Sequence, residues 1–318
     1  MLEPGSHRWS KPASILVATD LGDVDRLFPF ALQQAKQSGA RLFLLHVLTA
    51  TNSIAVDPGG LPYYSPSEAI HYAEKFLASY CAEARQANID CEVLVREGTP
   101  TQQILAAVRQ LHIDRVLLGT RSRSKWGKLL LGSVAEQVLR SVSVPVFTVG
   151  PEAHQGEAAV DGQETILHAT SLSKASRASA ALACEVARAS RSQLILLHVL
   201  TPGGSNHDLA PGAEGYATEG WAKDQLVSLI PSDLACQCAC STRVVTGHIA
   251  IEILAHASAV HASLIVLGAV HSSAMGAIAR EGTVYRVLAH ARCPVLTLRE
   301  PDQVEETSLN QQGFVLHE

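Results

Sequence analysis

The sequence lacks the apolar run of about 20 residues that a membrane-spanning helix needs. Its first residues, Met1 to Pro12, contain no apolar core of the kind that a signal peptide has. The seven cysteines are an odd number scattered over a long chain, so they do not suggest a disulfide framework. We therefore expect a protein of the reducing cytoplasm with no membrane anchor.

A basic excess and the common catalytic motifs are also missing. The formal net charge is −5 with both signs mixed along the chain, which argues against a general nucleic-acid binder. There is no GxxxxGK[ST] phosphate loop, no HExxH, no GxSxG and no CxxC zinc knuckle, and no Ser-His-Asp set can be placed by spacing. The chain is therefore not a P-loop NTPase, and we expect no catalytic residues.

The sequence contains an internal duplication of one unit. The chain has 318 residues, 47% of them hydrophobic, which suits two domains of about 150 residues with buried cores. Four blocks recur in the same order, 149 to 152 residues apart. The paired blocks are 15–20 with 166–171, 44–49 with 196–201, 116–119 with 266–268, and 144–149 with 293–298. One α/β unit has therefore been repeated.

Each unit consists of short apolar segments that alternate with amphipathic ones. In the first unit, Asp23–Ser38 and Ser67–Ala87 have apolar residues at helical spacing, and Thr99-Pro100 looks like the start of a third helix over Gln102–Gln110. Strands covered on both faces by helices form a parallel, doubly wound sheet. We expect the five strands near 14–19, 41–48, 91–96, 114–119 and 145–149.

The domain boundaries follow from composition. Gly150–Glu164 has no apolar stripe and is expected to be a linker, so the domains span 13–150 and 164–299. The tail from Glu300 is polar and expected to be mobile. Each unit also has one long loop, Ala50–Pro66 and its counterpart Pro202–Gly220, which is either a functional lid or a disordered segment.

A candidate anion site lies where strand order reverses in the first unit. Ligands of open parallel sheets bind beyond the carboxyl ends of the strands, and Asp20 and Gly119 both end strands at that point. Gly132-Ser133 opens the next helix, whose free N–H groups and positive dipole end suit phosphate. Four basic residues between them could bind phosphate: Arg121, Arg123, Lys125 and Lys128.

Two simpler interpretations remain open here. The loop after Gly119 could be a solvated basic turn between a strand and a helix. Asp20 could cap the helix that begins near Asp23, contact a ligand, or do both in different states.

The loop Gly-x2-Ser-x9-Gly-Ser, from Gly119 to Ser133, resembles the Gly-x2-Gly-x9-Gly-Ser nucleotide signature of the universal stress protein family. The resemblance covers nearly the whole chain, and Ser122 departs from it at the second glycine. It implies an adenine-nucleotide site in which an Asp after the first strand and a Val in the second contact the nucleoside. The matched residues are Asp20, Val47, Gly119, Gly132, Ser133 and Val134.

The resemblance also implies a fold. Members have the strand order 3-2-1-4-5, and the fifth strands of two domains pair, so that this chain would form an internal pseudo-dimer through Val144–Val149 and Cys293–Leu298. Further dimerisation of whole chains is expected.

The second unit has a degraded version of the signature. Gly268 is kept, but His271 replaces the second glycine and Glu281-Gly282 replaces the final Gly-Ser. A shift of one residue would bring Gly282-Thr283 to that position without restoring the basic cluster, of which Arg280 remains. Ser171 replaces Asp20. We predict no tight ATP binding in this unit.

Histidines and cysteines of the second unit are candidate metal or redox ligands. His248 and His271 follow strands at the ligand edge, whereas His198 matches His46 and is expected to be structural. Cys236, Cys238 and Cys240 alternate along the chain, and we expect them to be small buried hydrophobes like Cys91. The histidines of this unit's elements are His168, His198, His248, His256, His261, His271 and His290.

These features together predict a cytoplasmic stress-response protein that binds ATP or a related adenine nucleotide in its first domain, with or without Mg²⁺. It would act by changing shape or partner affinity. One alternative is a nucleotide-independent interaction scaffold. A second is a slow nucleotide hydrolase, since Asp20 is the acidic group placed beside the phosphate loop.

Overall fold

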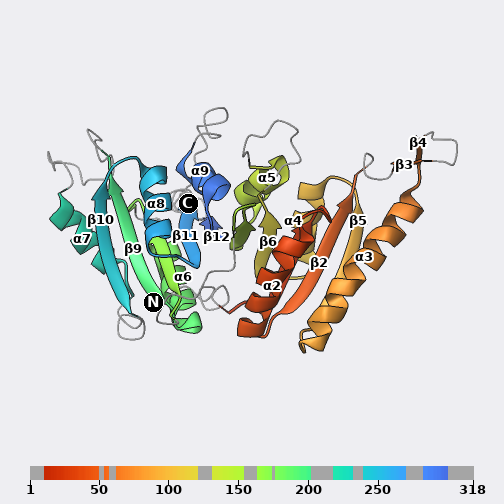
Figure 1. Ribbon diagram of the computed structural model, residues 1–318, viewed down its shortest axis with the longest axis horizontal. Helices are drawn as coiled ribbons and strands as arrows, with labels where there is room; N and C mark the ends of the chain where they lie inside the picture. Colours follow the sequence, from red (N-terminus) through yellow and green to blue (C-terminus); the bar gives the residue numbers. More distant parts are fainter. Residues whose placement is uncertain are drawn as a thin grey trace, which may run out of the picture.

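A single ten-stranded sheet runs through the whole molecule (Figure 1). The computed structural model describes residues 11–49, 54–56, 62–120, 131–153, 163–173, 176–201, 218–231, 239–269 and 282–299. The strands lie side by side in the order β10-β9-β8-β11-β12-β7-β6-β1-β2-β5. Their bounds are β1 Ser14–Thr19, β2 Arg41–Leu48, β5 Cys91–Glu97, β6 Arg115–Gly119, β7 Val146–Val149, β8 Thr165–Ala169, β9 Gln193–Leu200, β10 Cys240–Thr246, β11 Leu264–Ala269 and β12 Val295–Arg299.

Each half of the sheet is parallel and has the strand order 3-2-1-4-5, as expected. The halves meet at β7 and β12, which pair antiparallel with Phe147 opposite Leu296. The hydroxyl of Thr148 donates to the Val295 carbonyl at 3.1 Å, and Thr297 donates to the Val146 carbonyl at 3.2 Å. The predicted pairing of fifth strands in an internal pseudo-dimer is therefore confirmed.

Helices cover both faces of the sheet, which explains why the strands are apolar on both sides. In β1, Ile15 and Val17 belong to one core, and Leu16 and Ala18 belong to a core on the opposite face. The first face carries α2 Val24–Ser38, α3 Pro66–Gln86, α6 Ser176–Ser190 and α7 Glu219–Ser228. The second face carries α4 Pro100–Gln110, α5 Ser133–Ser141, α8 Ile249–Ala259 and α9 Thr283–His290.

The long loop of the first half contains regular structure. β3 (Ile54–Val56) and β4 (Pro62–Tyr64) pair antiparallel in a small hairpin, and α3 begins directly after it at Pro66. These two strands lie in the segment for which a functional lid and a disordered loop were both left open, and their pairing shows regular structure at these positions. The counterpart from 202 to 217, most of the linker and the tail from Glu300 lie outside the described residues. No described helix is both long enough and apolar enough to span a membrane.

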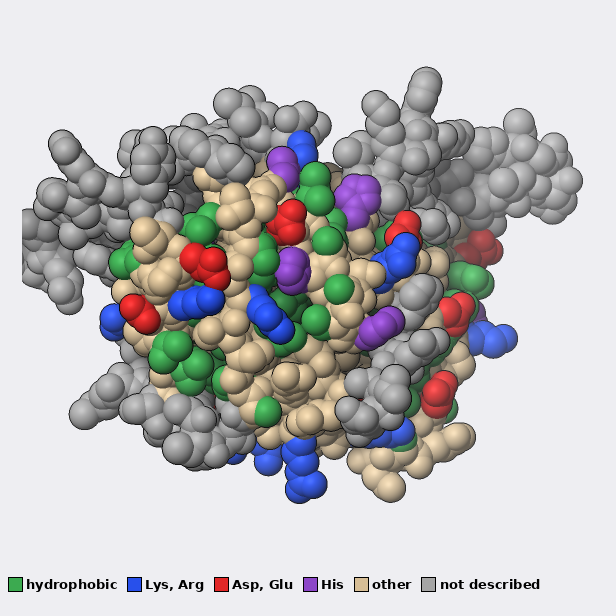
Figure 2. Space-filling view, turned by 60° about the vertical axis from the view of Figure 1, so that its left-hand side comes forward, with side chains coloured by type: hydrophobic (Ala, Val, Ile, Leu, Met, Phe, Trp, Pro, Cys, Tyr) green, Lys and Arg blue, Asp and Glu red, His purple; other side chains and the backbone are tan. Residues whose placement is uncertain are grey.

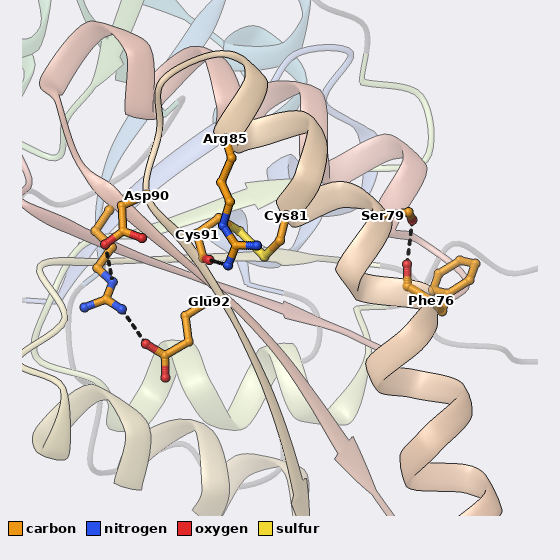
Figure 3. The surroundings of a disulfide bond; sticks show 8 residues. Phe76, Ser79, Cys81, Arg85, Asp90, Cys91 and Glu92 are labelled. Carbon is orange, nitrogen blue, oxygen red and sulfur yellow. Dashed lines mark hydrogen bonds and ion pairs between the residues drawn. A yellow bond between two sulfur atoms is a disulfide. The ribbon is translucent and has the colours of Figure 1, made fainter.

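Cys91 is paired with Cys81 in a disulfide, which corrects the expectation that it is a free buried thiol (Figure 3). Cys81 lies near the end of α3, and Cys91 is the first residue of β5, with a Cα–Cα distance of 5.1 Å. Arg85 Nη2 donates to the Cys91 carbonyl at 2.6 Å, so the same two elements are also joined by a hydrogen bond. Cys236 and Cys238 lie outside the described residues.

Candidate functional site

The carboxyl edge of the first half contains a cavity of about 210 Å³. It brings together six predicted site residues from four elements: Asp20 after β1, Val47 in β2, Gly119 ending β6, and Gly132, Ser133 and Val134 at the start of α5. Arg121, Ser122 and Arg123, together with Lys125 and Lys128, lie outside the described residues. The wall also includes Ala18, Thr19, Asp23, Leu45, His46, Thr49, Pro100, Ile104, Leu118 and Ala135, which sequence reasoning did not assign to the site.

Asp20 forms a local turn and does not cap α2. The backbone N–H of Gly22 donates to Asp20 Oδ1 at 2.8 Å, and Leu21 between them has a φ of 70°. The N-cap position of α2 is Asp23, whose side chain makes no capping hydrogen bond. The turn fixes the exposed Asp20 carboxylate on the cavity wall through one oxygen, which leaves the second oxygen available to a ligand.

Hydrogen bonds of His46 and Thr19 hold the backbone at the end of β1 in place. His46 Nδ1–H donates to the Thr19 carbonyl at 3.0 Å, and the N–H of Leu21 donates to Thr19 Oγ1 at 3.0 Å. The second half repeats the arrangement, since His198 Nδ1 lies 2.9 Å from the Thr170 carbonyl and burial lowers the pKa of His198. Both matched histidines therefore make a structural hydrogen bond to the residue that follows or ends the first strand of their half, and His46 also lines the cavity.

Asp23 is the most consequential residue that the sequence reading missed. Thr19 Oγ1 donates to Asp23 Oδ1 at 2.6 Å, and the side chain lines the cavity beside Asp20. Burial raises the pKa of Asp23, and the neighbouring Asp20 charge raises it further, against the opposing effects of the Thr19 hydrogen bond and the Arg26 charge. In the sequence, Asp23 is an acidic residue at the start of a helix. Such a residue is more readily interpreted as a helix boundary than as part of a binding site.

The start of α5 forms the polar end of the cavity. Gly132 is its N-cap, with φ −63° and ψ 144°, and its N–H donates to the Thr120 carbonyl at 3.0 Å. The first N–H groups of a helix have no intrahelical acceptor, and the residues that carry them here, Ser133, Val134 and Ala135, line the cavity. The lining also includes the aliphatic side chains of Leu45, Ile104 and Leu118. The cavity lining therefore combines aliphatic side chains, two carboxylates and the N-terminus of a helix.

Metal ligands do not gather among the described residues, where no group of three or more His, Cys, Asp or Glu side chains could hold an ion. His168 is fully buried in the core, its Nδ1 lies 3.1 Å from the Val266 carbonyl, and burial lowers its pKa to about 4. His248 lies at the ligand edge of the second half, while His271 falls outside the described residues.

The second half keeps the backbone geometry of the α5 start. Gly282 is the N-cap of α9, with φ −63° and ψ 155°, and Thr283 is the first helical residue. Gly282-Thr283 therefore occupies the place of Gly132-Ser133, and the alignment of Glu281-Gly282 with that pair was wrong by one residue. The shift restores a small residue and a hydroxyl. Ser171, which replaces Asp20, has its hydroxyl bonded to Ser173 at 3.2 Å.

Comparison with known proteins agrees with this architecture. The universal stress protein family model matches residues 13–150 and 163–299. A universal stress protein from Thermus aquaticus is 30% identical over 139 residues, which cover 43% of this chain and 97% of that protein. A crystal structure of a universal stress protein from Archaeoglobus fulgidus has a TM-score of 0.68 at 23% identity and covers 92% of this chain and 98% of its own, which shows a shared fold.

A shorter solved structure matches one half. It is a universal stress protein in complex with cAMP, with 22% identity and a TM-score of 0.33, covering 43% of this chain and 95% of that one. Two matches to one family model, over both halves of the sheet, account for most of the sequence. The chain belongs to the universal stress protein family and contains two of its domains in tandem.

Proposed function

We propose that the first half binds ATP or a related adenine nucleotide and that the protein acts as a nucleotide-dependent regulator of the stress response. One observation carries the proposal: six residues predicted from the sequence, on four separate elements, line a single cavity at the switch point of the sheet. Association of whole chains into a dimer and an unidentified protein partner are part of the same proposal.

The cavity lining has chemically complementary residues for each part of an adenine nucleotide. Leu45, Ile104 and Leu118 offer an aliphatic bed for the base, and the free oxygen of Asp20 can accept a hydrogen bond from a ribose hydroxyl. The start of α5 at Gly132 and Ser133 suits phosphate. A cavity of about 210 Å³ is smaller than typical ligand pockets of about 300–1,000 Å³, so it would hold the nucleoside, with the phosphates at the α5 start.

The lining of this cavity suits Mg²⁺ only when a nucleotide is bound as well. Mg²⁺ prefers carboxylate and phosphate oxygens and commonly binds to one or two carboxylates plus substrate phosphates. Asp20 and Asp23 provide two carboxylates on one cavity wall. When bound with the nucleotide, the ion would neutralise phosphate charge that these two acids would otherwise repel.

Calorimetric titration with ATP and Mg²⁺ tests the proposal, with Gly132→Leu as the disabling variant. The φ of Gly132 is accessible to any residue, so the added side chain acts on the cavity and not on the backbone. We expect one site per chain in the native sequence and none in Gly132→Leu. Gly220→Leu is the matched control, because a side chain there meets open space in α7.

The two alternatives give different results in the same experiment. A nucleotide-independent scaffold would show no binding heat and no nucleotide released from the purified protein. A slow hydrolase would release ADP above a protein-free control, and this release would disappear in Gly132→Leu together with binding. Retention of full ATP affinity in Gly132→Leu would contradict the proposed site.

A further inference from the structure

Strand β5 is the outermost strand of the first half, and one of its two edges pairs with no described strand (Figure 1). The other edge pairs with β2, where the N–H of Leu42 donates to the Asp90 carbonyl at 2.8 Å and the N–H of Gly98 donates to the Leu48 carbonyl at 3.0 Å. Because the backbone groups of successive strand residues point to opposite sides, the even-numbered residues of β5 face β2. The odd-numbered residues direct their N–H and C=O groups away from the sheet.

An arginine from α3 confirms this alternation and limits the open edge. Arg85 Nη2 donates to the outward Cys91 carbonyl at 2.6 Å, so the first residue of β5 is already bonded (Figure 3). In the middle of the strand, Val93 and Val95 direct four backbone groups outward, and none of these has a partner among the described residues. An open edge of this kind is a template for a strand from another chain.

The side chains around these two valines are complementary to themselves when the strand is reversed. Residues 92–96 read Glu-Val-Leu-Val-Arg. When Val93 exchanges hydrogen bonds with Val95 of an antiparallel second copy, the two-fold axis passes between the two Leu94 residues. Glu92 of each copy then lies opposite Arg96 of the other. Opposite charges at directly opposed positions stabilise a strand pair, and the symmetry makes this pair occur twice.

Charges within one chain leave both members of this pair able to bind a second copy. Arg41 binds two carboxylates, with Nε 3.0 Å from Asp90 and Nη2 2.5 Å from Glu92, so this cluster has one negative charge in excess. Arg96 is half-buried and forms no ion pair with the residues that the structure describes. One end of the open strand therefore has an excess acid, and the other has a base without a described acidic partner.

The opposite end of the sheet lacks this complementarity. In β10, the other outermost strand, the N–H of Leu194 donates to the Ala239 carbonyl at 2.9 Å, so Thr242 and Val244 are the outward residues in the middle. The equivalent antiparallel pairing would place the exposed Arg243 opposite its own copy, and like charges there oppose association. Figure 2, in which the β10 end comes forward, shows acidic and basic side chains interspersed on the described surface, so this view has no large acidic patch to offset two arginines.

The helix beside β5 leaves room for a second copy. Ala78, Ala82 and Arg85 lie on one face of α3, at helical spacings of four and three residues. Arg85 reaches the outward Cys91 carbonyl, so this face is directed toward the open edge. Ala78 and Ala82 are exposed and small, so the α3 helices of two copies can lie side by side on the same face of the joined sheet.

We propose that β5 is the interface through which two copies of this chain associate, with Leu94 at the two-fold axis. The inference rests on the whole-chain dimer of the proposed function and names the surface that forms it. Pairing joins two ten-stranded sheets and satisfies the open backbone groups of Val93 and Val95. The two β10 strands remain at the outer ends, where Arg243 keeps further copies from adding in the same way.

Sedimentation velocity of the full chain at several concentrations tests this interface with charge reversals. We expect the native chain to form dimers, and Glu92→Arg and Arg96→Glu each to weaken the dimer about tenfold or more, because each variant places like charges opposite each other twice. An equimolar mixture of the two variants should recover the native dimer affinity, because each arginine then faces a glutamate of the other chain. Arg243→Glu is the matched control at the β10 edge and should dimerise as the native chain does.

A backbone variant tests the pairing independently of charge. Val95→Pro removes one outward N–H and leaves the hydrogen bonds to β2 in place, so this variant should be folded and monomeric. Thermal unfolding checks the fold of each variant.

Three results would overturn the interface: a monomeric native chain, a dimer that persists in Arg96→Glu and Val95→Pro, or a mixture of charge variants that stays monomeric. Association that is lost in Arg243→Glu would assign it to the β10 edge instead. Calorimetry with ATP reports separately on the nucleotide site. Gly132→Leu should dimerise as the native chain does, so a failure of nucleotide binding and a failure of the interface are distinguishable.

Discussion

The carboxyl group of Asp23 occupies the space into which a side chain on Gly119 would project. A Cβ at Gly119 would overlap Asp23 Oδ2 and would lie 3.2 Å from Arg26 Nη2. A side chain at the end of β6 would therefore force the Asp23 carboxyl group to move, in addition to any close approach of a ligand. The contact joins the two loops between which the proposed nucleotide lies.

Replacing Gly119 with alanine should weaken nucleotide binding because the added methyl group displaces the Asp23 carboxyl group into the cavity. We expect about tenfold lower affinity for ATP and a loss of about 1–3 kcal/mol in the free energy of unfolding. Calorimetry and urea denaturation measure the two effects. The double variant Gly119→Ala/Asp23→Gly should recover most of the stability, and an equal loss in single and double variants would contradict the overlap.

Asp23 should make the folded state less stable as the pH rises. Its folded-state pKa lies above the ordinary value of 3.8 because of burial, so the folded state holds the proton more tightly than the unfolded chain does. The free energy of unfolding should therefore fall as pH increases from about 3.8 through the raised pKa of the folded state. Asp23→Asn should lack this decline in urea denaturation over a pH series. Parallel curves for the two proteins would contradict the raised pKa.

The strands could be predicted closely because their signal is local. β1 and β2 have the predicted bounds, 14–19 and 41–48, since strands buried on both faces are mostly apolar. The order of strands within each half and the pairing of β7 with β12 are long-range relationships. They followed from the family resemblance and not from periodicity.

Two contacts could not be predicted from the sequence because they depend on how separate elements pack against each other. The overlap of Asp23 with Gly119 joins positions almost a hundred residues apart. The pairing of Cys81 with Cys91 depends on where α3 ends relative to β5. The sequence left two registers open for the counterpart of Gly132, and the helix N-caps select Gly282.

Reduction of the Cys81–Cys91 disulfide should destabilise the first half. The bond closes a segment with a sequence separation of 10, for which chain entropy predicts a loss of about 2–3 kcal/mol on removal. Thermal unfolding of the oxidised protein should therefore occur at a higher temperature than in the presence of dithiothreitol. The variant Cys81→Ala/Cys91→Ala is the control and should be insensitive to the reductant. Two additional reactive thiols in the untreated, denatured protein would show that the bond is absent.

Removing a core side chain where the halves meet should destabilise both halves together. Leu296 is fully buried in β12, opposite Phe147 of β7, and the two residues belong to a core that extends under α2 and α6. Leu296→Ala should lower the free energy of unfolding by about 2–5 kcal/mol through lost burial and a residual cavity.

Tyr285→Phe is the matched control for this boundary, because it removes only the exposed hydrogen bond between Arg140 Nε and the Tyr285 hydroxyl at 3.1 Å. Its cost should be at most about 1 kcal/mol, since water can replace the lost partner. Calorimetric unfolding should show one cooperative transition in the native protein and in Leu296→Ala, because the shared core couples the two halves of the sheet. Two separate transitions, with only the second-half transition shifted in Leu296→Ala, would show that the halves unfold independently in spite of the continuous sheet.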